Sequence, residues 1–159
     1  MDRRKFLINN SKVALWMTLI PAAGFSITDN VNFKKYKSNR PQLNERTFTS
    51  DVVEETIKKV KASIADAELA WMFENCYPNT LDTTVDYEVI DGKPDAFVIT
   101  GDIDAMWLRD STAQVWPYMP LIDKDPKIKN LILGLINRQV KCILTDPYAN
   151  AFYKDLTRI

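Results

Sequence analysis

Two stretches of the chain carry apolar residues at alternating spacings of three and four, which is typical of one face of an α-helix. In residues 51–75 that face holds Val53, Ile57, Val60, Ile64, Ala67 and Trp71. In residues 126–145 it holds Ile128, Leu131, Ile132, Leu135, Ile136, Val140 and Ile143. We therefore predict two long amphipathic helices, each of which needs a partner to cover its apolar face.

Local signals mark the ends of both predicted helices. Asp51 begins the first helix with a pattern that resembles a capping box, and Pro78 forbids its continuation. Asp125 caps the second helix in front of Pro126, a residue favoured in the first helical turn. Pro147 stops the second helix, so both helices have defined ends.

The segment between the two helices favours a small β-excursion. Asp91-Gly92 is the signal of a tight hairpin turn, and β-forming residues stand on both sides of it. Gly101-Asp102 predicts a turn, and the Trp-rich segment after it predicts a short helix that ends at Pro120.

These elements predict a mainly α fold with a small β-hairpin. Long helices joined by loops that carry Trp, Asp and Asn suit an α-helical toroid, in which paired helices ring a central pit. Three helices cannot close such a ring, so either the chain ends too early to hold all of it or the fold is not a toroid. No sequence repeat of about 20 to 50 residues indicates a regular solenoid.

The amino terminus has the order of regions found in signal peptides. Arg3-Arg4 opens a charged cluster, and an apolar run and small residues follow. The run is too short to cross a bilayer core of about 30 Å. We predict a twin-arginine-like signal peptide over residues 1–25 and an extended polar leader of low order over residues 26–49. The protein would be exported to a bacterial periplasm, with no stable membrane insertion after cleavage.

Two other interpretations of this terminus stay open. Asp2 occupies a position where the twin-arginine pattern usually has Ser or Thr, so the general secretory route remains an alternative. The same residues would also suit an ordinary amphipathic first helix.

Composition excludes several kinds of site. The chain has no histidine, which excludes a Ser-His-Asp triad, a Cys-His dyad and a His-ligated metal within these 159 residues. It has 21 basic and 21 acidic residues, and a net charge of zero indicates no nucleic-acid partner. Cys76 and Cys142 lack metal-ligand spacing; they would pair in an exported protein or stay as two buried thiols. We predict no metal and no cofactor.

The segment Gly101–Ser111 concentrates three carboxylates, one guanidinium and one indole. Carboxylates accept hydrogen bonds from vicinal hydroxyls, a guanidinium donates in a fixed fork, and an indole covers the apolar face of a sugar ring. If this segment were helical, Asp102, Met106 and Arg109 would share one side, with Asp110 beside Arg109. The same residues would also fit a solvated helix start with an ion pair and a core Trp.

Residues 100–118 resemble the signature of glycoside hydrolase family 125, and residues 73–84 and 145–152 resemble it in the same order. The resemblance implies an (α/α)6 barrel and an exo-acting, metal-independent, inverting α-1,6-mannosidase. Family members run to roughly three times this length. Residues 50–159 would therefore form the N-terminal part of the catalytic domain.

The resemblance also implies which residues would line the pocket for a terminal mannose. These are Asp102, Trp107, Arg109, Asp110 and Asn150. The general acid and base would be carboxylates downstream of residue 159, so we expect no catalytic residue within the chain. Asp104 departs from the neutral residue usual at its position and would be a plain surface acid.

The implied partner is a mannose-containing glycan, which these residues would hold without cleaving it by themselves. Two alternatives remain beside an α-mannosidase. One is a toroid enzyme for another sugar, such as a glucosidase or a phosphorylase. The other is a non-catalytic glycan-binding protein.

Overall fold

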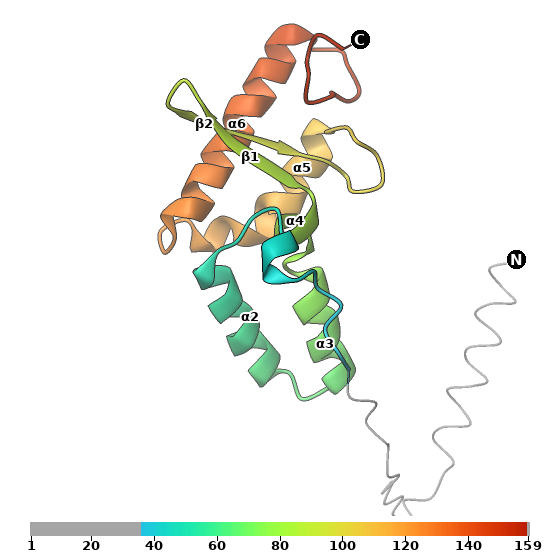
Figure 1. Cartoon of the computed structure of the whole chain (residues 1–159), viewed down its shortest axis with the longest axis vertical. Helices are drawn as coiled ribbons and strands as arrows, with labels where there is room; N and C mark the ends of the chain where they lie inside the picture. The colour runs from blue at the N-terminus through green and yellow to red at the C-terminus, as the bar shows by residue number, and fades with distance from the viewer. Residues whose placement is uncertain (1–35, 159) are drawn as a thin grey trace, which may run out of the picture. The chain divides into compact units, whose positions relative to one another are not determined.

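A computed structural model describes residues 36–158 of the chain (Figure 1). The predicted signal peptide and the first ten residues of the predicted leader lie outside the described residues. In order, the elements are η1 Leu43–Glu45, α2 Asp51–Ser63, α3 Ala67–Cys76, α4 Asn79–Thr83, β1 Val85–Ile90, β2 Lys93–Val98, α5 Leu108–Val115, η2 Trp116–Leu121 and α6 Pro126–Thr145. The described part is mainly helical with a single two-stranded sheet, as the sequence predicted.

The prediction of one helix over residues 51–75 is wrong, because the chain breaks at residues 64–66 and makes two helices, α2 and α3. Ile64 is extended, and the Asp66 carboxylate accepts hydrogen bonds from the backbone N–H groups of Glu68 and Leu69 at 2.8 and 2.9 Å. This cap offers the backbone an alternative to continuing the helix. The two helices then lie side by side (Figure 1).

The hairpin forms as predicted. Asp91 and Gly92 have φ of 51° and 75°, and a two-residue turn of this kind matches the right-handed twist of paired strands. The register runs from Val85 opposite Val98 to Ile90 opposite Lys93. The returning strand β2 begins at Lys93, directly after the turn.

The hairpin lies across α6, and the core is centred on that contact (Figure 1). Ala96 and Val98 of β2 and Leu131 of α6 are fully buried. Gly134 permits the close approach, because a Cβ atom on it would lie 3.0 Å from the carbonyl carbon of Asp95.

A buried charged group also joins β2 to α6. Asp95, only 1% exposed, accepts hydrogen bonds from Arg138 and Lys141, both at 2.6 Å. The Arg138 guanidinium lies 5.8 Å from the ring centre of Phe97. Both oxygens of the Asp95 carboxylate thus have a hydrogen-bond partner of opposite charge, which is the condition under which burial of a charge is tolerated.

The helix α6 is bounded as predicted, with Asp125 accepting a hydrogen bond from the Lys127 N–H at 2.8 Å. Its predicted apolar stripe divides into two parts. The first four members of the stripe are buried, whereas Ile136, Val140 and Ile143 are about half exposed, at 50%, 49% and 48%. The hairpin covers one side of the helix, and no other element among residues 36–158 covers this second side. None of the helices in the described part is long and apolar enough to cross a membrane.

The described end of the predicted leader, residues 36–49, is held by specific contacts that the sequence did not indicate. The backbone N–H of Phe48 donates to the carbonyl of Leu81 at 2.9 Å, and the Trp71 indole N–H donates to the backbone carbonyl of Lys37 at 2.8 Å. The Arg40 side chain is only 7% exposed and pairs with Asp82 at 2.7 Å. Residues 36–49 are therefore polar in composition but still pack against the rest of the described chain, partly through a charged side chain.

Candidate functional site

The loop that carries most of the predicted site residues is not helical, so the shared helical face considered for Asp102, Met106 and Arg109 does not form. Gly101 has a φ of 112°, which favours glycine. The Thr100 hydroxyl donates to the Asp102 carboxylate at 3.1 Å. The helix α5 starts only at Leu108, after residue 107 in an extended conformation.

A pair of backbone hydrogen bonds joins this loop to the end of the chain. Met106 donates to the carbonyl of Phe152 at 2.8 Å and accepts from the Phe152 N–H at 2.9 Å, which makes an isolated antiparallel bridge. Met106 is fully buried and Phe152 is nearly so. The backbone N–H and carbonyl of Met106 are both hydrogen-bonded to Phe152. They are therefore not available for hydrogen bonds within a helix, and no helix runs through the loop.

The first turn of α5 is fixed against α6 by one side chain. The Gln139 amide donates to the carbonyl of Leu108 and to the Ser111 hydroxyl, both at 3.1 Å, and to the Thr112 hydroxyl at 2.9 Å. At the other end of α5, the Gln114 side-chain amide donates to the carbonyl of Ile99 at 2.9 Å. These bonds set the direction in which α5 presents its amino-terminal residues.

Arg109 and Asp110 lie next to each other on that first turn and form an ion pair of 2.9 Å. Their side chains are 84% and 39% exposed, so the pair contributes little to stability in water. Asp110 also stands at the amino end of a helix, where a negative charge is favoured. Both charged groups are therefore accessible to a bound molecule.

The five predicted binding residues come from two segments that the bridge brings together. Trp107, Arg109 and Asp110 lie one, three and four positions after Met106, while Asn150 precedes Phe152 by two positions. In antiparallel pairing these neighbours leave the bridge on the same side. Asp102 lies on the other side of Met106 in the same loop, and both Asp102 and Asn150 are exposed.

Together these five residues carry two carboxylates, a guanidinium, an amide and a half-buried indole. Such groups can donate to and accept from the hydroxyls of a sugar and cover its apolar face. Within residues 36–158, no group of three His, Cys, Asp or Glu side chains is arranged to hold a metal ion.

An open cleft of about 610 Å³ lies beside this loop, and no pattern in the sequence indicates it; we name it the Asp104 cleft. Its walls come from five separate segments and include Thr47, Thr83, Thr84, Tyr87, Asp104 and Lys154. Asp104, expected to be a plain surface acid, lines the cleft. Thr83 and Thr84 lie at the start of the predicted β-excursion and Thr47 lies in the predicted leader, so only the folded chain brings them to one cleft.

The two cysteines are free thiols. Cys76 is exposed on α3, whereas Cys142 is completely buried on α6. The alternative that they form a disulfide is therefore not what the structure has.

Residues 66–158 match the family model described as metal-independent alpha-mannosidase (GH125). The chain belongs to glycoside hydrolase family 125. The match covers more than half of the chain and includes the whole Gly101–Ser111 segment and the bridge partner Phe152.

Two relatives are similar to the chain. The chain is 49% identical over 114 residues to the meiotically up-regulated gene 157 protein of Schizosaccharomyces pombe, a match over 71% of the chain and 22% of that protein. It is 42% identical, with a TM-score of 0.59, to a structure from Streptococcus pneumoniae described as a metal-independent alpha mannosidase in a non-productive substrate complex with alpha-1,6-mannobiose. That match covers 69% of the chain and 25% of the solved one.

The chain thus spans about a quarter or less of the length of the relatives it matches. The expected fold class, part of an (α/α)6 toroid with a small β-hairpin, is confirmed by the helical structure together with this family membership.

Proposed function

We propose that residues 50–159 are the N-terminal part of the catalytic domain of an α-mannosidase that removes terminal α-1,6-linked mannose from glycans. The Met106–Phe152 bridge carries the proposal, because it joins the loop that carries Asp102 and leads into α5 to the segment that carries Asn150, and both lie within the residues that match the GH125 family. The Streptococcus pneumoniae relative, described as a complex with alpha-1,6-mannobiose, supports the choice of sugar and linkage.

In this proposal the five predicted residues bind the terminal mannose. The Asp102 and Asp110 carboxylates accept hydrogen bonds from its hydroxyls, and Arg109 donates. Trp107 covers the apolar face of the ring. Asn150 offers both a donor and an acceptor. Bonds of this kind raise the rate where they strengthen in the transition state.

The reaction proposed is a direct displacement with inversion. One carboxylic acid donates a proton to the leaving oxygen, and one carboxylate activates a water molecule on the opposite face of the sugar. Inversion needs carboxyl groups roughly 6.5–9.5 Å apart to leave room for that water. We assign neither role to a residue of this chain, and we place both beyond residue 159, in the part of the family's length that the chain does not span.

The 159-residue chain alone would then be inactive and only weakly stable. Part of the apolar face of α6 is uncovered among the described residues, and the proposed acid and base are absent. We also propose that residues 1–25 direct export, to a bacterial periplasm, by a twin-arginine-like signal.

A graft tests the function directly. Residues 66–158 replace the matching segment of the Streptococcus pneumoniae mannosidase, and hydrolysis of α-1,6-mannobiose is measured beside aryl mannosides and aryl glucosides. We expect cleavage of the mannosides only. A folded graft that cleaves glucosides instead would indicate a toroid enzyme for another sugar.

The unmodified chain gives the complementary measurement. Calorimetry with mannose and an activity assay on the same sample separate binding from turnover. A cooperative melt together with cleavage of mannobiose by these 159 residues would contradict the assignment of the acid and base. Sugar binding by the graft without any turnover would favour a glycan-binding protein.

A further inference from the structure

One hydrogen bond closes the segment that carries four of the five proposed mannose-binding residues. The Gln114 side-chain amide, near the end of α5, donates to the backbone carbonyl of Ile99 at 2.9 Å, 15 positions earlier. The four residues that lie between these two are Asp102, Trp107, Arg109 and Asp110. The Gln114 amide therefore joins the beginning of the loop to the end of the helix that follows it.

The loop between β2 and α5 is anchored to the rest of the chain at its two ends. At the start, the N–H of Ile99 donates to the carbonyl of Thr84 at 3.2 Å, and the carbonyl of Ile99 accepts from Gln114. At the end, Met106 is held by its backbone bridge. Residues 101–104 are all exposed, and among the described residues none of their hydrogen bonds reaches outside the loop. The position of the loop thus depends on these two anchors.

The second polar atom of the Gln114 side chain is costly for the fold. The amide oxygen Oε1 is buried and has no hydrogen-bond partner among residues 36–158. A buried acceptor without a partner costs at least about as much free energy as one ordinary hydrogen bond contributes. The amide as a whole therefore adds little to the stability of the protein. An unbranched apolar side chain of similar size would pack there without this cost.

We propose that Gln114 is a positioning residue for sugar binding, which fixes the loop of Asp102 against α5 through the Ile99 carbonyl. The inference rests on the proposed function for the identity of the ligand, a terminal mannose. Gln114 itself does not touch the sugar, because its amide nitrogen is bonded to Ile99 and its oxygen is buried. Its bond holds the Asp102 carboxylate in one place relative to Arg109 and Asp110.

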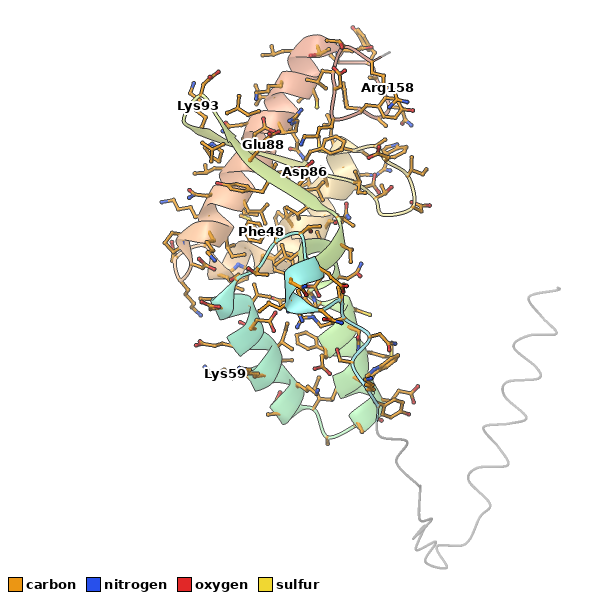
Figure 2. All side chains as sticks on the ribbon, viewed as in Figure 1. Phe48, Lys59, Asp86, Glu88, Lys93 and Arg158 are labelled. Carbon is orange, nitrogen blue, oxygen red and sulfur yellow. The ribbon has the colours of Figure 1, made fainter. Side chains whose placement is uncertain are left out.

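Two substitutions separate a positioning role from a structural one. Gln114→Met removes both the donor and the unpaired acceptor at similar volume. Asn137→Leu is the matched control, because the Asn137 amide also donates to a backbone carbonyl, that of Pro94, at 2.8 Å. Lys93, the neighbour of Pro94, lies at the turn of the hairpin and away from α5 (Figure 2). The control therefore removes the same kind of bond outside the candidate site.

Nuclear magnetic resonance of the 159-residue protein tests the anchor without any sugar. Under the proposal, Gln114→Met shifts the amide signals of residues 101–104 and lowers their order parameters. Asn137→Leu leaves those signals unchanged. Identical signals for residues 101–104 in Gln114→Met and the unmodified protein would overturn the proposal.

The graft tests whether the position of the loop matters to catalysis. Gln114→Met should lower kcat for α-1,6-mannobiose about tenfold, because small displacements of binding groups slow the chemistry. Its melting temperature should equal or exceed that of the unmodified graft, since the unpaired acceptor is gone. Asn137→Leu should lower the melting temperature and leave kcat unchanged. An unchanged kcat in Gln114→Met, or a kcat that falls in both variants in proportion to lost stability, would contradict a positioning role.

A double-mutant cycle in the graft shows whether Gln114 acts through Asp102. Asp102→Ala should lower kcat by itself, and Gln114→Met should then add a loss of less than about twofold. A full tenfold loss in both backgrounds would overturn the action through Asp102.

Failure of the proposed function has a different signature. An Asp102→Ala graft with normal kcat, or an unmodified graft that cleaves no mannoside, would contradict the assignment of the mannose site. In either case the amide signals of residues 101–104 still decide whether Gln114 anchors the loop.

Discussion

Arg40 and Asp82 stand 42 residues apart in the sequence and meet through two parallel hydrogen bonds. Arg40 Nε donates to Oδ2 of Asp82 at 2.7 Å, and Nη2 donates to Oδ1 at 3.0 Å. The same guanidinium binds Glu54 at 2.6 and 3.0 Å. One side chain thus ties the segment before α2 to both α2 and α4.

Removal of this guanidinium should destabilise the chain. Arg40→Ala leaves two carboxylates short of a partner, and Asp82 is only 3% exposed. We expect a loss of about 3 kcal/mol in the free energy of unfolding, measured by urea denaturation. Arg109→Ala is the control, and a similar loss there would contradict the importance of burial.

The same cluster should make stability depend on acid. The pKa of Glu54 is lowered, chiefly by the hydrogen bonds that Arg40 donates. A lowered pKa in the folded state means that the stabilisation is complete above the ordinary pKa and is lost as the pH falls through the folded value. Stability should therefore fall as the pH drops through and below about 4.5, the ordinary pKa of a glutamate carboxyl.

Substitution of that carboxylate isolates its part in the pH dependence. Glu54→Gln should be less stable than the unmodified chain at neutral pH and lose less on acidification. Glu55→Gln, on the exposed neighbour, should follow the unmodified curve. Identical acid profiles for all three proteins would assign the acid sensitivity to other groups.

Gly134 should not tolerate a methyl group, although alanine favours helices. A Cβ atom there would lie 3.0 Å and 3.1 Å from backbone atoms of Asp95 and 3.1 Å from the Ala96 nitrogen, and a strand backbone in the core does not shift easily. We expect Gly134→Ala to cost about 1–3 kcal/mol. Lys129→Ala on the exposed side of α6 is the control, and thermal melts measure both.

Asp110 should matter to catalysis more than its exposure suggests. In the graft, Asp110→Ala should lower kcat/KM for mannobiose if the carboxylate holds a sugar hydroxyl. The expected loss of transition-state stabilisation is about 2–3 kcal/mol. A loss below about 0.5 kcal/mol would make it a surface cap of α5.

The two thiols should differ sharply in reactivity. Burial raises the pKa of the Cys142 thiol, and its side chain has no exposed surface. Cys76 is exposed. Iodoacetamide should modify Cys76 quickly in the native protein and Cys142 only after unfolding. Peptide mass spectrometry would show the modified residue. Modification of Cys142 at the same rate would indicate that α6 opens readily.

The parts of the fold that sequence could predict depend on neighbouring residues. Asp125-Pro126 and Asp91-Gly92 act on their own backbone, so the start of α6 and the hairpin were found. The break at Asp66 was missed because the apolar periodicity runs through it without interruption, and a single carboxylate decides between helix and cap.

The site shows the same division. Residue identities within Gly101–Ser111 indicated the family, yet the shape of the loop depends on Phe152, some 46 positions after Met106. The Asp104 cleft needs Thr47 and Lys154 together, and no local pattern connects them. Contacts between distant segments are what the sequence alone could not supply.

The uncovered side of α6 has a consequence for biosynthesis in the longer family members. The hairpin and α6 can form as soon as this segment leaves the ribosome, since their mutual contact lies within it. Ile136, Val140 and Ile143 would then face water until later helices emerge. During that time the exposed apolar side chains of α6 would be a binding surface for chaperones. They would also be the first surface of the nascent chain at risk of aggregation.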